Sequence, residues 1–536
     1  MATQRIAFTE WTPDLAGVAE NLSIAKNVVP TAIGYNPFPT AVNYSAAASE
    51  SLNNVFAGKF SSTTNVFAGG ATKLFKLDSA DLSMDNVSKA GNYSSIVKWN
   101  FTQFGDTVIA ANNVNKLQSY TLGSSALFDD LNASAPIAKY VTVVRDFVVC
   151  ANRDAGSNSN KVQWSNINDE TNWTSGAASQ SDFQIIADGG NITGMTGGEF
   201  GLILLDRSIV RMSYIGSPLF FQFDTISRNI GCVEGNSVVQ YGNMTYFLGA
   251  DGFYSCDGTT ITAIGTQKVD AWFYANVNQS QLNLMSSTID PFRKIVVWKF
   301  LDNFAHNTLL IYNWQVQKWS YGITDVDYVA SSASAGQTIE GLSAAYLVTA
   351  GSFVVGKSYT IDTLGTTTFT SIGALDNVVG ARFTATGVGT GTGTAVDLEA
   401  AAAASRTLDT MTTSLDDGLW AGGKFLFAGA RADRIVTFTG ANSTAELTTG
   451  DIGSESTSLV TLARPVVDNG SGSVAIASRM LLSDVPQLGS YTAANSENRV
   501  SLRSSGKYHR LSVIPSGSNW SNAIGIDIDV SPQGTR

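Results

Sequence analysis

Few residues in this chain have side chains that can act as a general base, a nucleophile or a metal ligand. The 536 residues include 2 His and 3 Cys, and histidine is the side chain that changes its charge nearest to neutral pH. His306 stands in the polar stretch DNFAHNT and His509 in the basic stretch GKYHR, so we expect both to be solvated surface residues. No zinc-ligand spacing, phosphate-binding glycine loop or Gly-x-Ser-x-Gly turn is present. The sequence therefore predicts no catalytic, cofactor-binding or metal-binding residue, and a protein that is not an enzyme.

Paired carboxylates deserve a separate test, because two of them can perform acid–base chemistry on a glycosidic bond. Asp129-Asp130 and Asp416-Asp417 are such pairs, but adjacent residues on a strand point to opposite faces. The stretch from Ser414 to Trp420 is similar to a sialidase aspartate box. Its Trp comes one residue too early and the stretch occurs once, so we interpret it as a surface turn.

The composition points away from helices and away from a DNA-gripping protein. Charged residues make up only 14% of the chain and hydrophobic residues 44%, so polar surface must come mainly from Ser, Thr, Asn and Gly. These residues favour turns and strands over helices. The chain carries 33 Lys and Arg against 44 Asp and Glu, a net charge of −11. Unspecific DNA binders instead present a basic face to the phosphates, so passing DNA should be repelled. The alternative interpretation is that the acidity simply keeps a weakly charged protein soluble. We expect the basic cluster near the C-terminal end, Arg499, Arg503, Lys507 and Arg510, to face a protein neighbour or solvent.

Cysteines and apolar runs indicate where the chain folds. An odd set of three, Cys150, Cys232 and Cys256, gives no disulfide framework and suits a reducing cytoplasm. The N-terminal stretch MATQRIAFTEW has no apolar signal core. No apolar run reaches the roughly 18 residues of a transmembrane helix, so we expect no membrane span.

Short alternating apolar runs separated by Gly- or Asp-containing turns recur along the chain. A pair of strands is expected around Arg145-Asp146. Gly242-Asn243, Asp251-Gly252 and Asp257-Gly258 are hairpin turn pairs, because Asn, Asp and Gly accept positive φ. The units repeat at roughly 40–50 residues, the length of a four-stranded propeller blade. The sequence predicts an all-β fold with a β-propeller-like main body, and a β-sandwich array is the competing architecture. Most of the tryptophans in these runs should be core anchors, and a sugar-binding or subunit-contact surface is the alternative for a few of them: Trp164, Trp173, Trp298, Trp314, Trp319 and Trp420.

One segment differs from its surroundings and indicates an insertion. Residues 346–396 have few charges and end in a Gly-Thr-rich run, and an alanine run at 400–404 follows as the best helix candidate. We expect a small inserted all-β domain in an outer loop, where insertions are tolerated. The predicted organisation is a first part of the propeller body at 1–340, an inserted domain and linker at 341–405, and a closing part of the body at 406–536.

Several stretches resemble the tail-nozzle, or packaged-DNA-stabilisation, proteins of short-tailed bacteriophages. The resemblance covers most of the chain outside about 340–405, and the insert is similar to a module found in phage structural proteins. The stretches are Trp11–Asp14, Asn27–Pro30, Gly34–Pro39, Asn172-Trp173, Ser181–Phe183, Gly189–Gly194, Gly231–Val238, Gly249–Gly258, Ile264–Asp270, Gly506–Arg510, Trp520 and Ile524–Asp527, with Phe369–Gly373 and Phe383–Gly387 in the insert.

The resemblance implies a structural virion protein, assembled in the bacterial cytoplasm and located in the tail. It implies a homo-oligomeric ring, typically six-fold, below the tail adaptor protein, through which genomic DNA passes transiently. Genome retention before ejection, and contacts with tail fibres or spikes, are further roles that the resemblance leaves open. The alternative is a receptor-binding or glycan-degrading tail protein, which would favour a repetitive β-helix with clustered carboxylates or a trimeric coiled coil.

Overall fold

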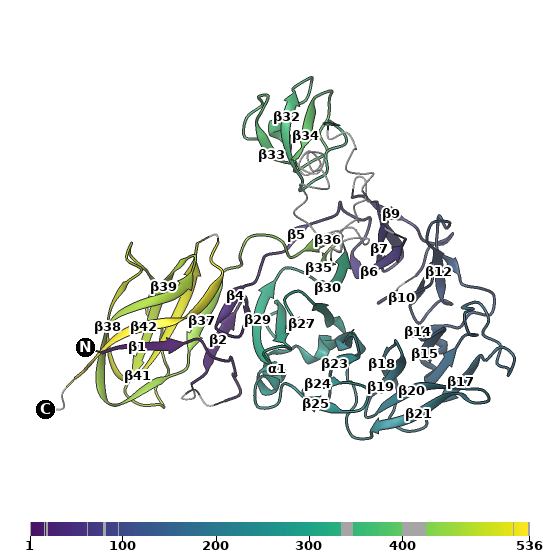
Figure 1. Ribbon diagram of the computed structural model, residues 1–536, viewed down its shortest axis with the longest axis horizontal. Helices are drawn as coiled ribbons and strands as arrows, with labels where there is room; N and C mark the ends of the chain where they lie inside the picture. The colour runs from purple at the N-terminus through teal and green to yellow at the C-terminus, as the bar shows by residue number, and fades with distance from the viewer. Residues whose placement is uncertain are drawn as a thin grey trace, which may run out of the picture. The chain divides into compact units, whose positions relative to one another are not determined.

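The computed structural model of the protein is all-β, with a propeller-like main body (Figure 1). It describes residues 2–533 apart from 16, 18, 19, 62, 79–81, 95, 334–346, 399–424 and 518. The chain forms two compact units. The terminal unit contains residues 1–41, 230–325 and 438–536, and the central unit contains 42–229 and 326–437.

The central unit contains four consecutive antiparallel sheets, each made of four strands in chain order, as in propeller blades. The first sheet is β6 (Leu52–Phe60), β7 (Thr63–Gly70), β8 (Leu74–Leu77) and β9 (Met84–Asn86), and the second is β10 (Asn100–Phe104), β11 (Thr107–Ala111), β12 (Gln118–Thr121) and β13 (Asp129–Asp130). The third sheet is β14 (Ala138–Val144), β15 (Phe147–Arg153), β16 (Asn158–Trp164) and β17 (Asp182–Ile185), and the fourth is β18 (Ile192–Thr196), β19 (Phe200–Leu205), β20 (Ile209–Gly216) and β21 (Phe220–Ser227).

Apolar clusters join each of these sheets to the next. Val148 and Cys150 of β15 pack in one cluster with Ile109 of β11, which joins the second and third sheets. Val149 from the same strand packs with Ile203 of β19, which joins the third and fourth. Successive residues of β15 thus serve opposite faces of one sheet, and β15 is buried on both sides.

A fifth sheet of the central unit is built from distant parts of the chain. Its order is β30 (Tyr328–Ala333), β35 (Phe425–Arg431), β36 (Arg434–Thr437) and β5 (Val42–Asn43). The short β5 adds residues from near the N-terminus to the edge strand β36, with Asn43 opposite Val436.

The inserted segment forms its own four-stranded sheet within the predicted range 341–405. The strands, in sheet order, are β31 (Leu347–Thr349), β34 (Thr394–Asp397), β32 (Ser358–Thr363) and β33 (Arg382–Thr384). A separate aromatic core, with Phe353, Tyr359, Phe369 and Phe383, fills this domain. The insertion interrupts the hairpin of β30 and β35, whose residues Ala333 and Phe425 lie opposite each other.

The terminal unit contains one four-stranded sheet and one 14-stranded sheet. The four-stranded sheet is β22 (Val239–Tyr241), β23 (Met244–Leu248), β24 (Phe253–Cys256) and β25 (Ile261–Ala263). A 14-stranded sheet follows the path β26 (Ser286–Asp290), β27 (Ile295–Leu301), β28 (Asn307–Asn313), β29 (Lys318–Thr324), β2 (Leu22–Lys26), β37 (Glu446–Thr449), β41 (Val500–Ser516), β38 (Ile452–Asp468), β42 (Asn522–Pro532), β4 (Tyr35–Pro37) and β3 (Val28–Pro30), with β1 (Ala2–Ala7) on β42, and β39 (Ser471–Arg479) between β41 and β40 (Thr492–Ala493).

The predicted closing part of the body, 406–536, is divided differently in the structure. Within the described residues of this range, β35 and β36 belong to a four-stranded sheet of the central unit, and residues 438–536 lie in the terminal unit. The physical reason is strand length and pairing. Strands β38 and β41 have 17 residues each, and β42 also pairs with β1 from the start of the chain. The first part, 1–340, likewise contributes to both units.

The predictions of two hairpin turns and of four buried tryptophans are confirmed. Gly242-Asn243 connects β22 to β23, and Arg145-Asp146 connects β14 to β15, with Arg145 at φ 53°. Trp164, Trp173, Trp298 and Trp319 are buried, and Trp314 is half-buried. Trp420, the alanine run at 400–404 and the stretch 414–420 lie outside the described residues. In the described part of the chain, no helix is both long and apolar enough to cross a membrane.

Replacing residues 334–424 by a short Gly/Ser turn should leave the central unit folded. Ala333 and Phe425 are already cross-strand neighbours, so the turn only has to close a hairpin, and loop closure of that kind costs little. We expect cooperative thermal unfolding, followed by circular dichroism, within a few degrees of the full chain. Ala330→Asp, which puts a charge at a site that is 5% exposed, is the destabilised control. Loss of soluble, cooperative unfolding in the deletion variant would mean that the insert belongs to the central core.

Candidate functional site

The two histidines occupy opposite environments. His306 is exposed, as predicted, and its Nδ1 lies 3.1 Å from an oxygen of Asp302. The prediction of a solvated His509 is wrong, because that residue is 3% exposed. His509 stands on β41 between β38 and β39, and the hydroxyl of Ser458 lies 2.8 Å from Nε2 and that of Ser478 lies 2.7 Å from Nδ1. Sequence reasoning missed this because His509 is covered by β38 and β39, two strands that are distant in sequence, while its neighbours in GKYHR are basic and include the exposed Lys507.

Burial sets the titration of His509. Desolvation of the charged form lowers the pKa of its imidazole. Its two closest polar partners are neutral hydroxyls rather than carboxylates, and a neutral ring needs one partner that donates and one that accepts. A serine hydroxyl can donate or accept a hydrogen bond, so one serine at each ring nitrogen meets both requirements. The arrangement therefore holds a neutral histidine. Because Ser458 is also 3% exposed, this Ser–His contact is a structural element and offers no nucleophile to a substrate.

The other chemically capable groups are dispersed. Cys150, Cys232 and Cys256 are buried, and burial raises the pKa of the Cys150 thiol to about 12. Asp130 accepts hydrogen bonds from Lys89 and Gln118. Within the described residues, no group of three His, Cys, Asp or Glu side chains is arranged to hold a metal ion.

Three of the stretches that carry the family resemblance meet in the core of the terminal unit. Asp14 accepts hydrogen bonds from the first turn of α1 (Asp270–Asn276), at the amides of Ala271 and Trp272. The ring of Trp11 lies 4.9 Å from that of Trp272. The resemblance therefore corresponds to a packing unit that joins the N-terminal segment to the strands after residue 230.

Two glycines make room for a buried carboxylate in this packing unit. A side chain at Gly252 or Gly265 would bring its Cβ within 2.1 or 2.0 Å of the Asp270 carboxylate. One oxygen of Asp270 accepts a hydrogen bond from the amide of Phe253. Burial raises the pKa of Asp270 to about 6, and the charges of Asp14 and Asp251 add to the increase.

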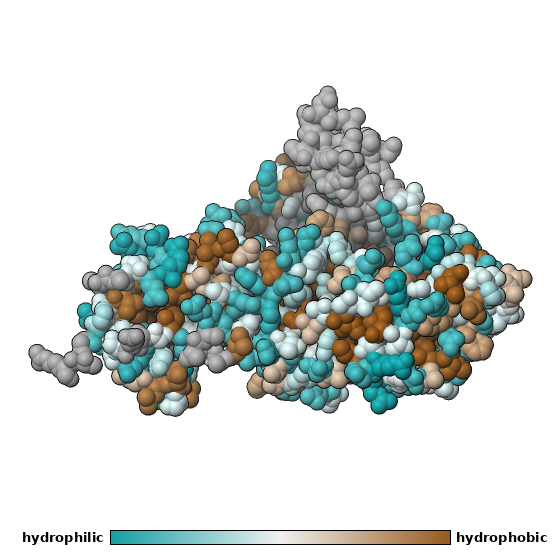
Figure 2. Space-filling model, turned by 60° about the horizontal axis from the view of Figure 1, so that its bottom comes forward, coloured by the Kyte–Doolittle hydropathy of each residue, from teal (hydrophilic) through white to brown (hydrophobic). Residues whose placement is uncertain are grey.

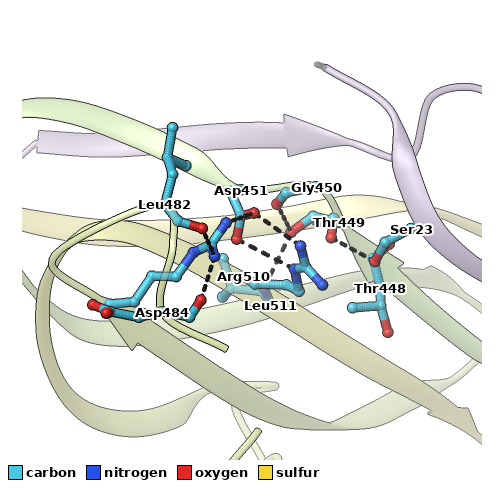
Figure 3. A network of polar contacts seen from close by, with 10 residues as sticks. Ser23, Thr448, Thr449, Gly450, Asp451, Leu482, Asp484, Arg510 and Leu511 are labelled. Carbon is cyan, nitrogen blue, oxygen red and sulfur yellow. Dashed lines mark hydrogen bonds and ion pairs between the residues drawn. The ribbon is translucent and has the colours of Figure 1, made fainter. Parts of the chain in front are cut away.

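The most highly charged buried contact is an ion triad centred on Asp451. Its carboxylate is 1% exposed and lies 2.5 Å from Nη2 of Arg479 and 2.8 Å from Nη2 of Arg510. Figure 3 shows the carboxylate of Asp451 beside the guanidinium of Arg510, near the corner where β37 passes into β38. The backbone amide of Asp451 donates to the carbonyl of Gly17, which ties the N-terminal segment to the same corner.

This triad corrects the interpretation of the C-terminal basic cluster. Arg499, Arg503 and Lys507 are exposed, but Arg510 is half-buried against Asp451. No motif in the sequence marks the contact, because 59 residues separate Asp451 from Arg510 and the pairing depends on the register of the long strands.

Arg479 also fixes a surface loop. Its Nη1 donates to the carbonyl of Leu482 at 2.5 Å and to that of Asp484 (Figure 3). The carboxylate of Asp484 accepts from the amide of Leu481 at 3.0 Å. The apolar loop, defined here as residues 480–488, is thus held by a guanidinium that is itself anchored on the buried Asp451.

The side chains of this loop face solvent although most of them are apolar. Figure 2 shows apolar residues, in brown, in several patches at the end of the molecule that contains β38 and β39. The exposed apolar residues of the loop are Met480 (47%), Leu481 (62%), Leu482 (46%), Val485 (79%) and Leu488 (36%).

A cleft of about 630 Å³ opens elsewhere on the terminal unit. It lies between the turn after β3, the turns that follow β26 and β28, and the segment around Trp520. The side-chain amide of Asn313 donates to the carbonyl of Pro30, and Lys318 Nζ donates to those of Thr31 and Ala32, so this wall is fixed. Gly34 ends the turn at φ 84°, where a Cβ would lie 2.2 Å from the carbonyl oxygen of Ala523.

The fold and these surfaces define an all-β, propeller-like protein with a fixed apolar loop and an open cleft. No family model and no curated protein matches the sequence. Among solved structures, BamB from Moraxella catarrhalis is similar at 11% identity and a TM-score of 0.33, over 61% of this chain and 92% of that chain. A chain of the mitotic checkpoint complex is similar at 11% identity and a TM-score of 0.34, over 54% of this chain and 90% of that chain. Likenesses at this level carry no argument about function.

Replacing Asp451 by Asn should destabilise the terminal unit strongly. The variant leaves two guanidiniums half-buried or buried without their counter-charge, and removing one partner of a buried ion pair costs about 3–5 kcal/mol. The free energy of unfolding can be measured by urea titration with tryptophan fluorescence. Glu497→Gln is the matched control, because Glu497 and Arg499 form an exposed pair whose loss should have no measurable effect. Equal stability of the two variants would mean that the triad contributes nothing.

The buried His509 should make the protein less stable in mild acid. Because its folded-state pKa is lowered, the unfolded chain binds more protons, and stability falls as the pH drops below the unfolded value of about 6.5. Asp270, with its pKa raised to about 6, has the opposite slope, so variants must be compared with the parent. We expect His509→Gln to lose less thermal stability between neutral pH and pH 5.5 than the parent. His306→Gln, at an exposed site, should retain the parent's loss. A parallel pH dependence for His509→Gln and the parent would show that His509 does not titrate there.

Proposed function

We propose that this protein is a structural subunit of the tail nozzle of a short-tailed bacteriophage, without enzymatic activity. Copies of the chain form a homo-oligomeric ring of six-fold order, next to the tail adaptor protein. The ring is a conduit for the genome during ejection and a gate for its retention beforehand. The stretches that resemble the nozzle family, from Trp11–Asp14 to Ile524–Asp527, support this proposal.

The observation that carries the proposal is the fixed apolar loop of the terminal unit. Exposed apolar residues are common when scattered singly on a soluble protein, but a contiguous apolar patch marks a contact surface. Five of the nine residues in this loop are large, apolar and exposed. Arg479, anchored on Asp451, holds their backbone in one conformation. A contact surface of this kind supports a role as a subunit in an assembly.

Charge is compatible with the conduit. A channel wall that attracts phosphates would slow a sliding polyanion, because each neutralised phosphate adds affinity. The chain has a net charge of −11, and several copies around one axis multiply that field. The exposed cations near the C-terminal end, Arg499, Arg503 and Lys507, are already included in this net negative charge.

Electron microscopy of the purified protein and of the virus particle tests the proposal. We expect closed six-fold rings in solution at micromolar concentration, and antibody labelling of the protein at the tail tip of intact particles. A monomer at these concentrations together with labelling away from the tail axis would contradict the proposal. Trimers with measurable glycan cleavage would instead support the alternative of a receptor-binding or glycan-degrading tail protein.

A further inference from the structure

We propose that the apolar loop of one copy of this chain inserts into the cleft of the next copy, so that this contact closes the ring. The inference rests on the proposed function in requiring a ring, and it adds the two surfaces that meet. Both surfaces belong to the terminal unit, so one compact unit carries everything the contact needs.

The convex surface is ready to bind without rearrangement. Met480, Leu481 and Val485 project apolar side chains from a loop whose carbonyls are held by Arg479. The ion triad therefore removes much of the ordering entropy that a flexible loop would lose on binding. Burying three or four such side chains contributes a substantial apolar term to association.

The concave surface matches the loop in chemistry. The apolar residues that line the cleft include Val29, Pro30, Pro37, Phe292, Val316 and Trp520. Its wall is held by the contacts of Asn313 and Lys318 with the carbonyls of residues 30–32. A cleft of about 630 Å³ lies within the size range of sites that enclose ligands of several tens of atoms.

The rim of the cleft and the apolar loop carry charges of opposite sign. Arg293 and Lys294 both line the cleft. Arg293 is paired with Asp290 at 2.7 Å, whereas Lys294 is exposed and is in no ion pair within the described residues. The loop carries one carboxylate, Asp484, which is exposed and is in no ion pair within the described residues. Opposite charges at the rim of an apolar contact fix its register and speed association.

The symmetry of the contact follows from its two unlike halves. A two-fold contact joins the same patch on both copies of the chain, whereas a loop that enters a cleft joins two different patches. Such a head-to-tail contact repeats around an axis and closes into a ring when the rotation allows it. Loop-to-cleft insertion therefore favours a ring over a dimer.

Cysteine cross-linking of the full-length chain tests the contact directly. The native cysteines are buried, so engineered surface cysteines will react selectively with a short bismaleimide. We expect a variant with both Val485→Cys and Ala32→Cys to give a ladder of covalent oligomers. Each single variant alone should give no ladder, and an equimolar mixture of the two single variants should give covalent dimers. Val485 is 79% exposed and Ala32 is exposed, so neither change should disturb folding.

Surface substitutions test how much the contact contributes. Leu481→Ser with Val485→Ser should raise the protomer concentration at half assembly, measured by mass photometry, at least tenfold. Leu375→Ser with Val378→Ser is the matched control, since both residues are exposed on the inserted domain, and it should assemble like the parent. Asp484→Lys and Lys294→Asp should each weaken assembly, and their combination should restore part of it.

Each outcome separates this inference from the proposed function. Rings that form normally in the Leu481→Ser, Val485→Ser variant, or a double-cysteine variant that forms rings without covalent ladders, would overturn the loop-to-cleft contact and leave the ring intact. A parent chain that remains monomeric would overturn both. Thermal unfolding like that of the parent in every variant verifies that weaker assembly does not reflect misfolding.

Discussion

Pairing between the two ends of the chain is the constraint on which the rest of the structure depends. Strand β1 pairs with β42, and β2 pairs with both β37 and β29. Without these N-terminal strands, the edges of β29, β37 and β42 would present unpaired backbone groups, which a folded sheet cannot bury without a large cost. In the central unit, β5 gives β36 the same protection. The terminal unit is therefore complete only when residues from near both ends of the chain are present, and the central unit needs the N-terminal residues of β5.

The Asp451 triad depends on that arrangement. The corner between β37 and β38 lies where the segment around Gly17 and Asn21 accepts hydrogen bonds from the amides of Asp451 and Gly450. The buried carboxylate is thereby placed between two guanidiniums, one from β39 and one from β41. One of these guanidiniums continues outward to the carbonyls of the surface loop. A contact between distant strands thus determines the shape of a surface, and the apolar residues of that surface add no stability to the isolated chain.

Local sequence signals predicted the local structure, and they failed where pairing is non-local. The pair Arg145-Asp146 predicted its hairpin because a two-residue turn constrains its own backbone, and Trp298 and Trp319 predicted core positions because of their apolar area. The low charge of residues 346–396 indicated a separate domain, and that segment has its own aromatic core. His509 was mistaken for a surface residue because β41 lies between two strands that are distant in sequence. The triad and the loop were missed for the same reason, and 438–536 could not be told from propeller strands by alternation alone.

The position of the inserted domain has a consequence for how such genes diverge. Ala333 and Phe425 face each other across one hairpin, so the inserted segment leaves the host sheet and returns to it at the same point. Any module whose own ends are close together can occupy that point without altering the strands on either side. Recombination between related genes could therefore replace this domain as a cassette while the host hairpin keeps its register. Changes in the inserted domain would then be inherited independently of changes in the surrounding sheets.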